Sequence, residues 1–285
     1  MRCNSNFRNG AVLLAVSMLL FTACHRSDNP PLSADDNGGY ASDASRIEFA
    51  TDDAISIADA AGATFNGAFM RTTHTTYMGV CATVGYDTSA TDVTHTLSIY
   101  FGNTDCVCLD GRKRQGYINV TYTGEYSDSG QQHIISFDNY YVNDNQLSGT
   151  IVTMRVDTTV TGDWYYKVQV NDTLNVSQYP LNSQITAWEG NLERRWITGF
   201  TTGDRGDDAF SISGSATLTR GNGDVFTFAI ATPLQVALNC NFVESGVVDV
   251  SSVAGARRLD YGTGNCDQYA NLYIGTTPYA ITLAQ

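Results

Sequence analysis

The sequence predicts an all-β fold, an antiparallel meander of about twelve strands, sandwich-like or curved, that follows one short helix. Charged residues make up only 16% of the chain, while Tyr, Phe, Thr, Val and Gly are abundant, as in β-sheets. From about residue 66, short segments alternate apolar and polar residues between Gly, Asn and Asp turns, so neighbouring strands should pair antiparallel. Strands and helices do not alternate along the chain, which argues against a parallel sheet.

The first segment, residues 1–23, is typical of a secretory signal peptide. Arg2 and Arg8 give it a basic start, residues 10–21 form a short apolar run, and small residues precede Cys24. The apolar run is too short to span a bilayer. We therefore expect export of the chain and removal of this segment.

The end of this segment, Phe21-Thr22-Ala23-Cys24, resembles the lipobox of bacterial lipoproteins, with Phe21 in place of the usual Leu. The resemblance implies that Cys24 is acylated and ties the mature chain to a membrane. The alternative is an ordinary secreted protein in which this cysteine occurs by chance.

The mature chain is strongly acidic. Removal of residues 1–23 takes two of the 16 Lys and Arg residues and none of the 29 Asp and Glu residues, which leaves a formal charge of −15. Such a surface repels phosphate backbones, so nucleic acid is not expected as a partner. About 240 residues follow, enough for one large β domain or two small ones.

Two elements are expected before the strands. Residues 24–46 are rich in Asp, Ser, Gly and Pro and lack apolar periodicity, which is typical of a flexible tether. The β-rich domain is expected over residues 47–285. Thr51 is expected to cap a short helix at its start, where Asp52 and Asp53 suit the positive end of the helix dipole.

Twelve segments then carry the strand pattern. The turn at residues 221–224 is a strong hairpin signal, and residues 170–173 are a second candidate. Periodicity leaves open whether the sheet forms a barrel, a sandwich or an open meander; we favour one continuous sandwich-like or curved meander, with two stacked sub-domains as the alternative. The segments are 80–86, 95–102, 116–126, 133–144, 147–157, 164–172, 183–199, 209–219, 225–234, 245–252, 270–275 and 279–283.

Five of the seven cysteines lie in the body of the chain, so at least one is left without an internal partner. Cys240 and Cys266 stand alone in the last third and most simply pair with each other. Cys81 is expected to pair with Cys106 or Cys108. The Cys106-Val107-Cys108 spacing fits neither a CxxC redox pair nor a zinc site, which favours a structural role.

Several stretches, among them residues 99–126 and residues 259–275 with their LDYGTGNCD motif, resemble a largely uncharacterised family of exported lipoproteins from Bacteroidota. The resemblance implies lipid anchoring at the outer membrane, a β-rich body and the Cys240–Cys266 pair, and it implies no activity. The residues after Cys24 lack the acidic run of a surface-export signal, so the membrane face is left open. The similar stretches are 80–87, 99–126, 137–150, 194–214, 231–234, 259–275 and 280–283.

Two acidic loops are candidates for calcium, because their turns bring oxygen atoms together. Neither matches an EF-hand loop, and tight or solvated turns explain both, so we expect no metal and no cofactor. The loops contain Asp260, Gly262, Gly264 and Asp267, and Asp204, Asp207 and Asp208.

A set of aromatic residues is a candidate sugar-binding face, because aromatic rings stack on the apolar faces of ligands. Core packing and cross-strand pairing explain most such residues equally well. The set is Tyr140, Tyr141, Trp164, Tyr165, Tyr166, Trp188 and Trp196.

Catalytic patterns are weak in this sequence. No HExxH spacing and no GxSxG elbow occurs. No pattern brings two glutamates together as an acid/base pair. We expect a non-enzymatic binding or scaffold protein, with glycan as a candidate ligand; the alternatives are a lipid or lipoprotein carrier with an apolar concave face, and a glycoside hydrolase. The residues considered were His74, His95, His133, Glu125, Glu189 and Glu193.

Overall fold

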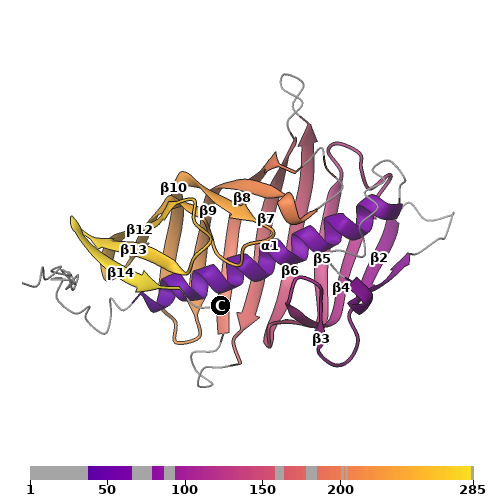
Figure 1. Ribbon diagram of the computed structural model, residues 1–285, viewed down its shortest axis with the longest axis horizontal. Helices are drawn as coiled ribbons and strands as arrows, with labels where there is room; N and C mark the ends of the chain where they lie inside the picture. The colour runs from indigo at the N-terminus through magenta and orange to yellow at the C-terminus, as the bar shows by residue number, and fades with distance from the viewer. Residues whose placement is uncertain are drawn as a thin grey trace, which may run out of the picture. The chain divides into compact units, whose positions relative to one another are not determined.

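One antiparallel sheet and one long helix that lies across its face make up the described part of the chain (Figure 1). The computed structural model describes residues 38–65, 79–86, 94–157, 164–177, 185–199, 202 and 205–283. The all-β class with one helix is confirmed, and the sheet does not close. Cys24, His74 and Asp204 lie outside the described residues.

The described strands follow the predicted meander, each pairing with its neighbour in sequence except that β3 pairs only with β4. Their bounds are β1 (Thr83–Tyr86), β2 (Thr94–Tyr100), β3 (Cys106–Val107), β4 (Lys113–Thr123), β5 (Gln132–Val142), β6 (Asn145–Asp157), β7 (Trp164–Asn175), β8 (Ile185–Thr198), β9 (Ala209–Arg220), β10 (Val225–Ala237), β11 (Ser245–Ser252), β12 (Gly255–Thr263), β13 (Tyr269–Ile274) and β14 (Thr277–Thr282). All pairings are antiparallel.

Each of the twelve predicted segments contains a strand, and two strands were missed. β3 is only two residues long, and β12 contains Gly255, Gly262 and two arginines, which obscure its alternation. The hairpin turn at residues 221–224 is confirmed between β9 and β10. The second candidate turn, residues 170–173, is wrong, because these residues lie inside β7.

The helix α1 (Gly39–Phe65) starts twelve residues before the expected cap at Thr51. Residues 39–46, which we assigned to the tether, form its first turns, and Asp52 and Asp53 lie in its middle. Eight alanines in the helix favour helical structure and allow close approach to the sheet. The early turns escaped the periodicity analysis because they bury polar as well as apolar side chains, among them Asp43 and Arg46.

The core lies between α1 and the face of the sheet that it crosses. Along the strands, alternate side chains point to this inner face, such as Ile118 and Val120 of β4, both fully buried. At one end of the helix the Tyr40 ring stacks on the Phe226 ring of β10, with 4.5 Å between the ring centres. Near the other end the Tyr86 hydroxyl of β1 donates a hydrogen bond to the Ala61 carbonyl. The helix thus joins β1 and β10, which lie far apart in the meander.

Candidate functional site

A buried carboxylate on α1, Asp53, receives two arginines from the connection before β4 and from β4 itself. Arg112 Nη1 donates to Asp53 Oδ1 at 2.5 Å, and Arg114 donates to both oxygens, at 2.6 and 3.0 Å. The Tyr140 hydroxyl of β5 donates at 3.3 Å. The side chains of Asp53 and Arg114 are both 0% exposed. A charge removed from water this completely requires such partners.

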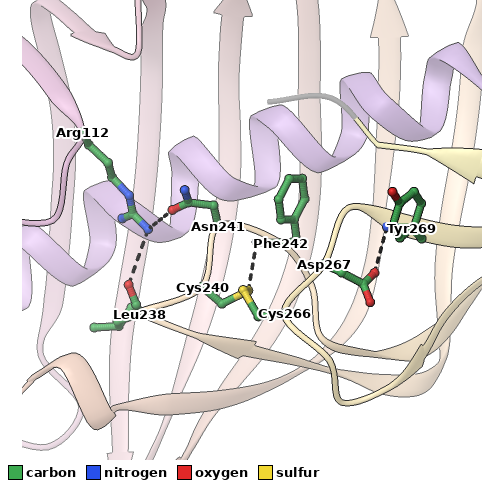
Figure 2. The surroundings of a disulfide bond; sticks show 8 residues. All are labelled: Arg112, Leu238, Cys240, Asn241, Phe242, Cys266, Asp267 and Tyr269. Atoms are coloured by element: carbon green, nitrogen blue, oxygen red, sulfur yellow. Dashed lines mark hydrogen bonds between the residues drawn. A yellow bond between two sulfur atoms is a disulfide. The ribbon is translucent and has the colours of Figure 1, made fainter.

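The cluster extends to the connection between β10 and β11. Arg112 Nη2 donates to Asn241 Oδ1 at 3.0 Å and to the Leu238 carbonyl at 3.5 Å, next to the Cys240–Cys266 disulfide (Figure 2). The guanidinium also lies 4.4 Å from the centre of the Phe49 ring. One arginine therefore binds the helix, the β10–β11 connection and its own hairpin together.

The balance of burial and charge sets the protonation of Asp53. Burial by itself raises the pKa of this carboxyl, but the charges and hydrogen bonds of Arg114 and Arg112 outweigh it and lower the pKa to about 2. Asp53 is therefore ionised at any physiological pH.

A second ion pair lies one residue earlier on the helix. Arg194 Nε of β8 donates to Asp52 Oδ1 at 2.6 Å, and Arg194 Nη2 donates to the Ser56 hydroxyl at 2.9 Å. The guanidinium carbon lies 3.2 Å from the centre of the Phe210 ring of β9. Neighbouring aspartates on α1 thus bind strands on different parts of the sheet.

Glu48, in contrast, has no cation beside it in the part of the chain that the structure describes. It is 8% exposed, and none of the described residues forms a hydrogen bond or an ion pair with its carboxyl. Burial, followed by the negative charge of Asp52, raises its pKa to about 8. Burial, and then Glu48, also raise the pKa of Tyr261. At neutral pH the Glu48 carboxyl is mostly protonated.

Three small cavities meet at Glu48, with volumes of about 30, 20 and 10 Å³. Trp188 and Arg194 line the second of them, and the Trp188 Nε1 and Arg194 Nη1 groups have no hydrogen-bond partner among the described residues. A cavity of this size admits one or two water-sized hydrogen-bonding groups. None of these three cavities admits a sugar ring or an acyl chain.

Asp172 of β7 is a second buried acid for which the described residues supply no cation. Thr51 Oγ1 donates to its Oδ2 at 2.6 Å, and its Oδ1 has no partner among the described residues. Burial raises the pKa of Asp172 to about 7, although the Thr51 hydrogen bond acts in the opposite direction. The helix–sheet interface therefore contains both firmly ionised and largely neutral carboxyls.

No family model, curated protein or solved structure matches this chain. None of the described helices is long and apolar enough to cross a membrane. The site has to be interpreted from its own geometry.

The disulfide predictions are confirmed. Cys240 pairs with Cys266, and Cys81 pairs with Cys106, the first of its two candidate partners. Cys108 is a free thiol, and it is buried. Burial raises the pKa of this thiol, with Arg114 opposing the shift, so the thiol is protonated and unreactive at neutral pH.

The predicted aromatic set divides between core and surface. Tyr140, Tyr166 and Trp188 are buried, so they belong to the core. Tyr165, on the outer face of β7, is half-buried, with the Arg195 guanidinium 5.0 Å from its ring centre. The set does not form one exposed platform. Its remaining members are Tyr141 and Trp196, which are half-buried, and Trp164, which begins β7.

The histidines and glutamates considered for catalysis are not brought together. His133 is buried, and its Nε2 lies 3.0 Å from the Tyr126 carbonyl; burial lowers its pKa. His95 contacts Tyr122 instead. Glu193 pairs with Arg195 on its own strand. The other two glutamates, Glu125 and Glu189, are exposed.

The acidic loops use their own carboxylates. Asp260 Oδ1 accepts from the Gly262 amide, and Asp267 Oδ1 accepts from the Tyr269 amide, each at 2.9 Å. In the other loop Asp207 Oδ1 accepts from the Thr202 hydroxyl at 2.9 Å, and Asp208 is buried. These are turn-capping contacts of the kind that Asp residues commonly make.

The two glycines of the first acidic loop, Gly262 and Gly264, have φ of 90° and 111°.

Among the described residues, one group with metal-ligand spacing occurs, Cys240, Glu244 and Cys266. Both of its sulfurs are bonded to each other, which removes them as thiolate ligands.

The residues that build the interface are not among those predicted from the sequence. One signal was present: Arg114 lies on the same face of its strand as Ile118 and Val120, by the period of two. An arginine on an apolar face requires a buried acid. Nothing in the sequence indicates that this acid is Asp53, 61 residues away.

Proposed function

We propose that this chain is a cell-envelope protein, anchored to the outer membrane through a lipid on Cys24, that acts as a non-enzymatic binding or scaffold protein. The basic start, short apolar run and small-residue exit of residues 1–24 support the anchor. The observation that carries the binding role is the outer face of the sheet, which α1 does not cover.

This outer face carries aligned polar side chains across β7, β8 and β9, which we term the polar rows. Gln169, Asn191 and Ser215 are cross-strand partners in one row. The neighbouring rows are Asn171, Glu189 and Thr217, and Lys167, Glu193 and Ser213. Residues directly opposite on paired strands point to the same side. Six of the nine side chains in these rows are amides or hydroxyls and three are charged, and such hydrogen-bonding groups suit a hydroxyl-rich ligand such as a glycan.

A glycan array on the mature protein tests this role. We expect retention of at least one glycan class, and about thirtyfold weaker binding when Gln169 and Asn191 are both replaced by Ala, since each lost hydrogen bond contributes about 1 kcal/mol. Asn271→Ala, an exposed asparagine on β13, is the matched control and should bind as the unmodified protein does. Equal binding by all three proteins would place the ligand elsewhere.

The anchor has its own test. Cells grown with a fatty-acid probe should label the unmodified protein and should not label Cys24→Ala. Label retained on Cys24→Ala contradicts the anchor, whatever the glycan array shows.

A lipid carrier is the second candidate. The inner face of the sheet is mostly apolar; among the described residues Glu48 forms no hydrogen bond or ion pair with it, and Asp172 is joined to α1 by the Thr51 hydroxyl. An acyl chain would enter only if α1 moved, because the cavities between them are water-sized. Solvent extraction and mass spectrometry of the purified Cys24→Ala protein would reveal one lipid per chain if the carrier role holds.

A glycoside hydrolase is the third and least supported candidate. Glu48 and Asp52 lie four residues apart on α1, and both line the cavity of about 30 Å³. A protonated and an ionised carboxyl are the pair that such enzymes use. The described residues, however, leave no room for a sugar ring between this pair and the β10–β11 connection.

A further inference from the structure

Three large aliphatic side chains are exposed around the Cys81–Cys106 disulfide. Val80 is fully exposed, Val107 is 65% exposed and Leu109 is 67% exposed. The disulfide joins cysteine Cα atoms 5.6 Å apart; Val80 and Val107 each adjoin one of these cysteines in the chain, and Leu109 follows two residues after Val107. We call Val80, Val107 and Leu109 the aliphatic patch. Apolar groups clustered in this way on a protein surface mark interaction sites.

The hairpin formed by β3 and the start of β4 lies beside α1 (Figure 1), and two of the three side chains, Val107 and Leu109, are exposed on it. The Gly111 amide donates to the Cys108 carbonyl at 2.9 Å, which closes a tight turn with Leu109 in it. Arg112 and Arg114 point inward to Asp53. Since side chains alternate along a strand, the intervening Lys113 points outward with its cross-strand partner Val107.

The exposure of the patch is therefore built into the fold. The two arginines tie the hairpin to α1 and the disulfide ties it to Cys81, and in this arrangement Val107 and Leu109 face solvent. A rigid, exposed aliphatic patch with a lysine beside it is suited to insertion at a lipid surface, where the lysine stem lies along the apolar layer and its charge reaches the head groups.

We propose that the aliphatic patch docks on the phospholipid surface to which Cys24 ties the chain, and so sets the orientation of the sheet on the membrane. The proposal rests on the anchor proposed above. The 15 residues from Cys24 to Gly39 span up to about 50 Å when extended. The hairpin contacts α1 at Phe49 and Asp53, about 15–21 Å along the helix from Gly39. The anchored membrane is thus within reach of the patch.

Charge favours zwitterionic over anionic lipid. The mature chain carries a formal charge of −15, and Asp105 and Asp144 are exposed near the patch, where Asp144 pairs with Lys113 at 3.7 Å. Anionic head groups would be repelled by this surface. The patch should therefore insert into phosphatidylcholine and insert less into phosphatidylglycerol.

Fluorescence quenching by brominated phosphatidylcholine measures the insertion. The mature lipidated chain is placed in vesicles as Leu109→Trp and, as matched control, as Val253→Trp, a fully exposed position on the β11–β12 turn. The unmodified protein supplies the background of its three tryptophans. We expect several-fold stronger quenching of the added fluorescence at position 109 than at position 253.

A second readout avoids the affinity of the new tryptophan for lipid. On the unmodified chain, amide hydrogen exchange over residues 106–112 should slow at least severalfold when the protein is on phosphatidylcholine vesicles. In the double variant Val107→Asp and Leu109→Asp it should not slow. Without lipid, exchange of the hairpin amides should not depend on protein concentration. Exchange that slows as the protein concentration rises would identify a second copy of the chain as the occupant of the patch and would overturn the proposal.

The outcomes separate the patch from the anchor. If the chain floats with vesicles and both tryptophans are quenched equally or not at all, the patch proposal is overturned and the anchor stands. If the chain does not float, the anchor fails; its free Cys24 thiol is then coupled to a maleimide lipid, since Cys108 is buried, and the same quenching comparison decides the patch.

Discussion

At the scale of single residues, the helix α1 shows two fates for a buried carboxyl. Asp53 has two guanidinium groups and a pKa of about 2, while Glu48, five residues earlier, has none and a pKa of about 8. Both are buried, so burial alone does not decide the charge. The presence of Arg114 on β4 and of Arg112 just before that strand decides it.

Glu48 predicts a pH dependence of stability. Its pKa is raised from 4.5 to about 8 in the folded chain, so the folded state holds a proton that the unfolded state loses. Stability should then fall by about 1.4 kcal/mol per pH unit from pH 4.5 until pH 8 and show no further loss from this group above that. Urea unfolding at several pH values should show a shallower slope for Glu48→Gln. An unchanged slope would mean that Glu48 is solvated.

Asp53 predicts a large effect of the opposite origin. Asp53→Asn leaves Arg112 and Arg114 with less compensation in a buried site, which should cost about 3–5 kcal/mol of unfolding free energy. Asp249→Asn removes a carboxylate from an exposed ion pair with Arg258 at 2.7 Å and is the matched control. Exposed pairs contribute little, so this control should unfold as the unmodified protein does. Similar losses in both variants would contradict the special role of Asp53.

At the scale of elements, close backbone approach restricts particular glycines. Gly116 on β4 has φ of 84°, and a Cβ atom placed there would lie against the carbonyl of Asn139 on β5. Gly223, in the β9–β10 turn, has φ of 90° with no atom within 4 Å of such a Cβ. The first glycine is needed for both its dihedral angle and the space, the second for its dihedral angle alone.

These two glycines give a paired prediction. Gly223→Ala should destabilise the protein by about 1 kcal/mol through its left-handed backbone. Gly116→Ala should cost more, about 2–4 kcal/mol in total, because the strands must also separate. Thermal unfolding of the two variants measures the difference, and equal losses would mean that β4 and β5 adjust without strain.

The disulfide between the β10–β11 connection and the β12–β13 connection staples the end of the meander. It closes a separation of 26 residues. Replacing both Cys240 and Cys266 by Ala should lower the unfolding free energy by about 3.5 kcal/mol in the chain-entropy model. Cys108→Ala leaves both disulfides intact and serves as the control, measured by the same denaturant titration. A loss of unfolding free energy in Cys108→Ala but not in the double variant would contradict a stabilising role of the Cys240–Cys266 disulfide.

At the scale of the whole molecule, α1 makes one structure of a long meander. The sheet of the described residues is continuous, and the helix contacts β10 near its start and β1 near its end. A meander by itself has mostly contacts between neighbours in sequence. The helix adds contacts between strands that lie far apart, and so couples them.

This coupling predicts a single unfolding transition. The far-ultraviolet circular dichroism of the sheet and the fluorescence of the buried Trp188 should change together with urea. In Asp53→Asn the two curves should separate if the helix detaches before the sheet unfolds. Two separate transitions in the unmodified protein would show that the halves of the meander are independent.

Much of the fold can be predicted from short stretches of the sequence. The period of two predicts all twelve segments that contain strands, Asn222-Gly223 predicts a hairpin, and the isolated Cys240 and Cys266 predict their own pairing. Each of these depends on residues close in sequence or on simple elimination. The predicted start of the helix was wrong. Residues 40–46 bury polar as well as apolar side chains, so no single apolar stripe marks this part of the helix in the sequence.

The sequence by itself determined an antiparallel meander, because alternation and turn chemistry are local properties of the chain. Three features depend on the folded arrangement: the face of the sheet that α1 covers, the face that is left uncovered, and the carboxyls that are ionised. Asp53 meets Arg112 and Arg114, and Glu48 meets no cation, through strand register and helix position, which depend on residues about 60 positions apart. Burial and charge act over a few ångströms in space, and those distances exist only once the chain has folded.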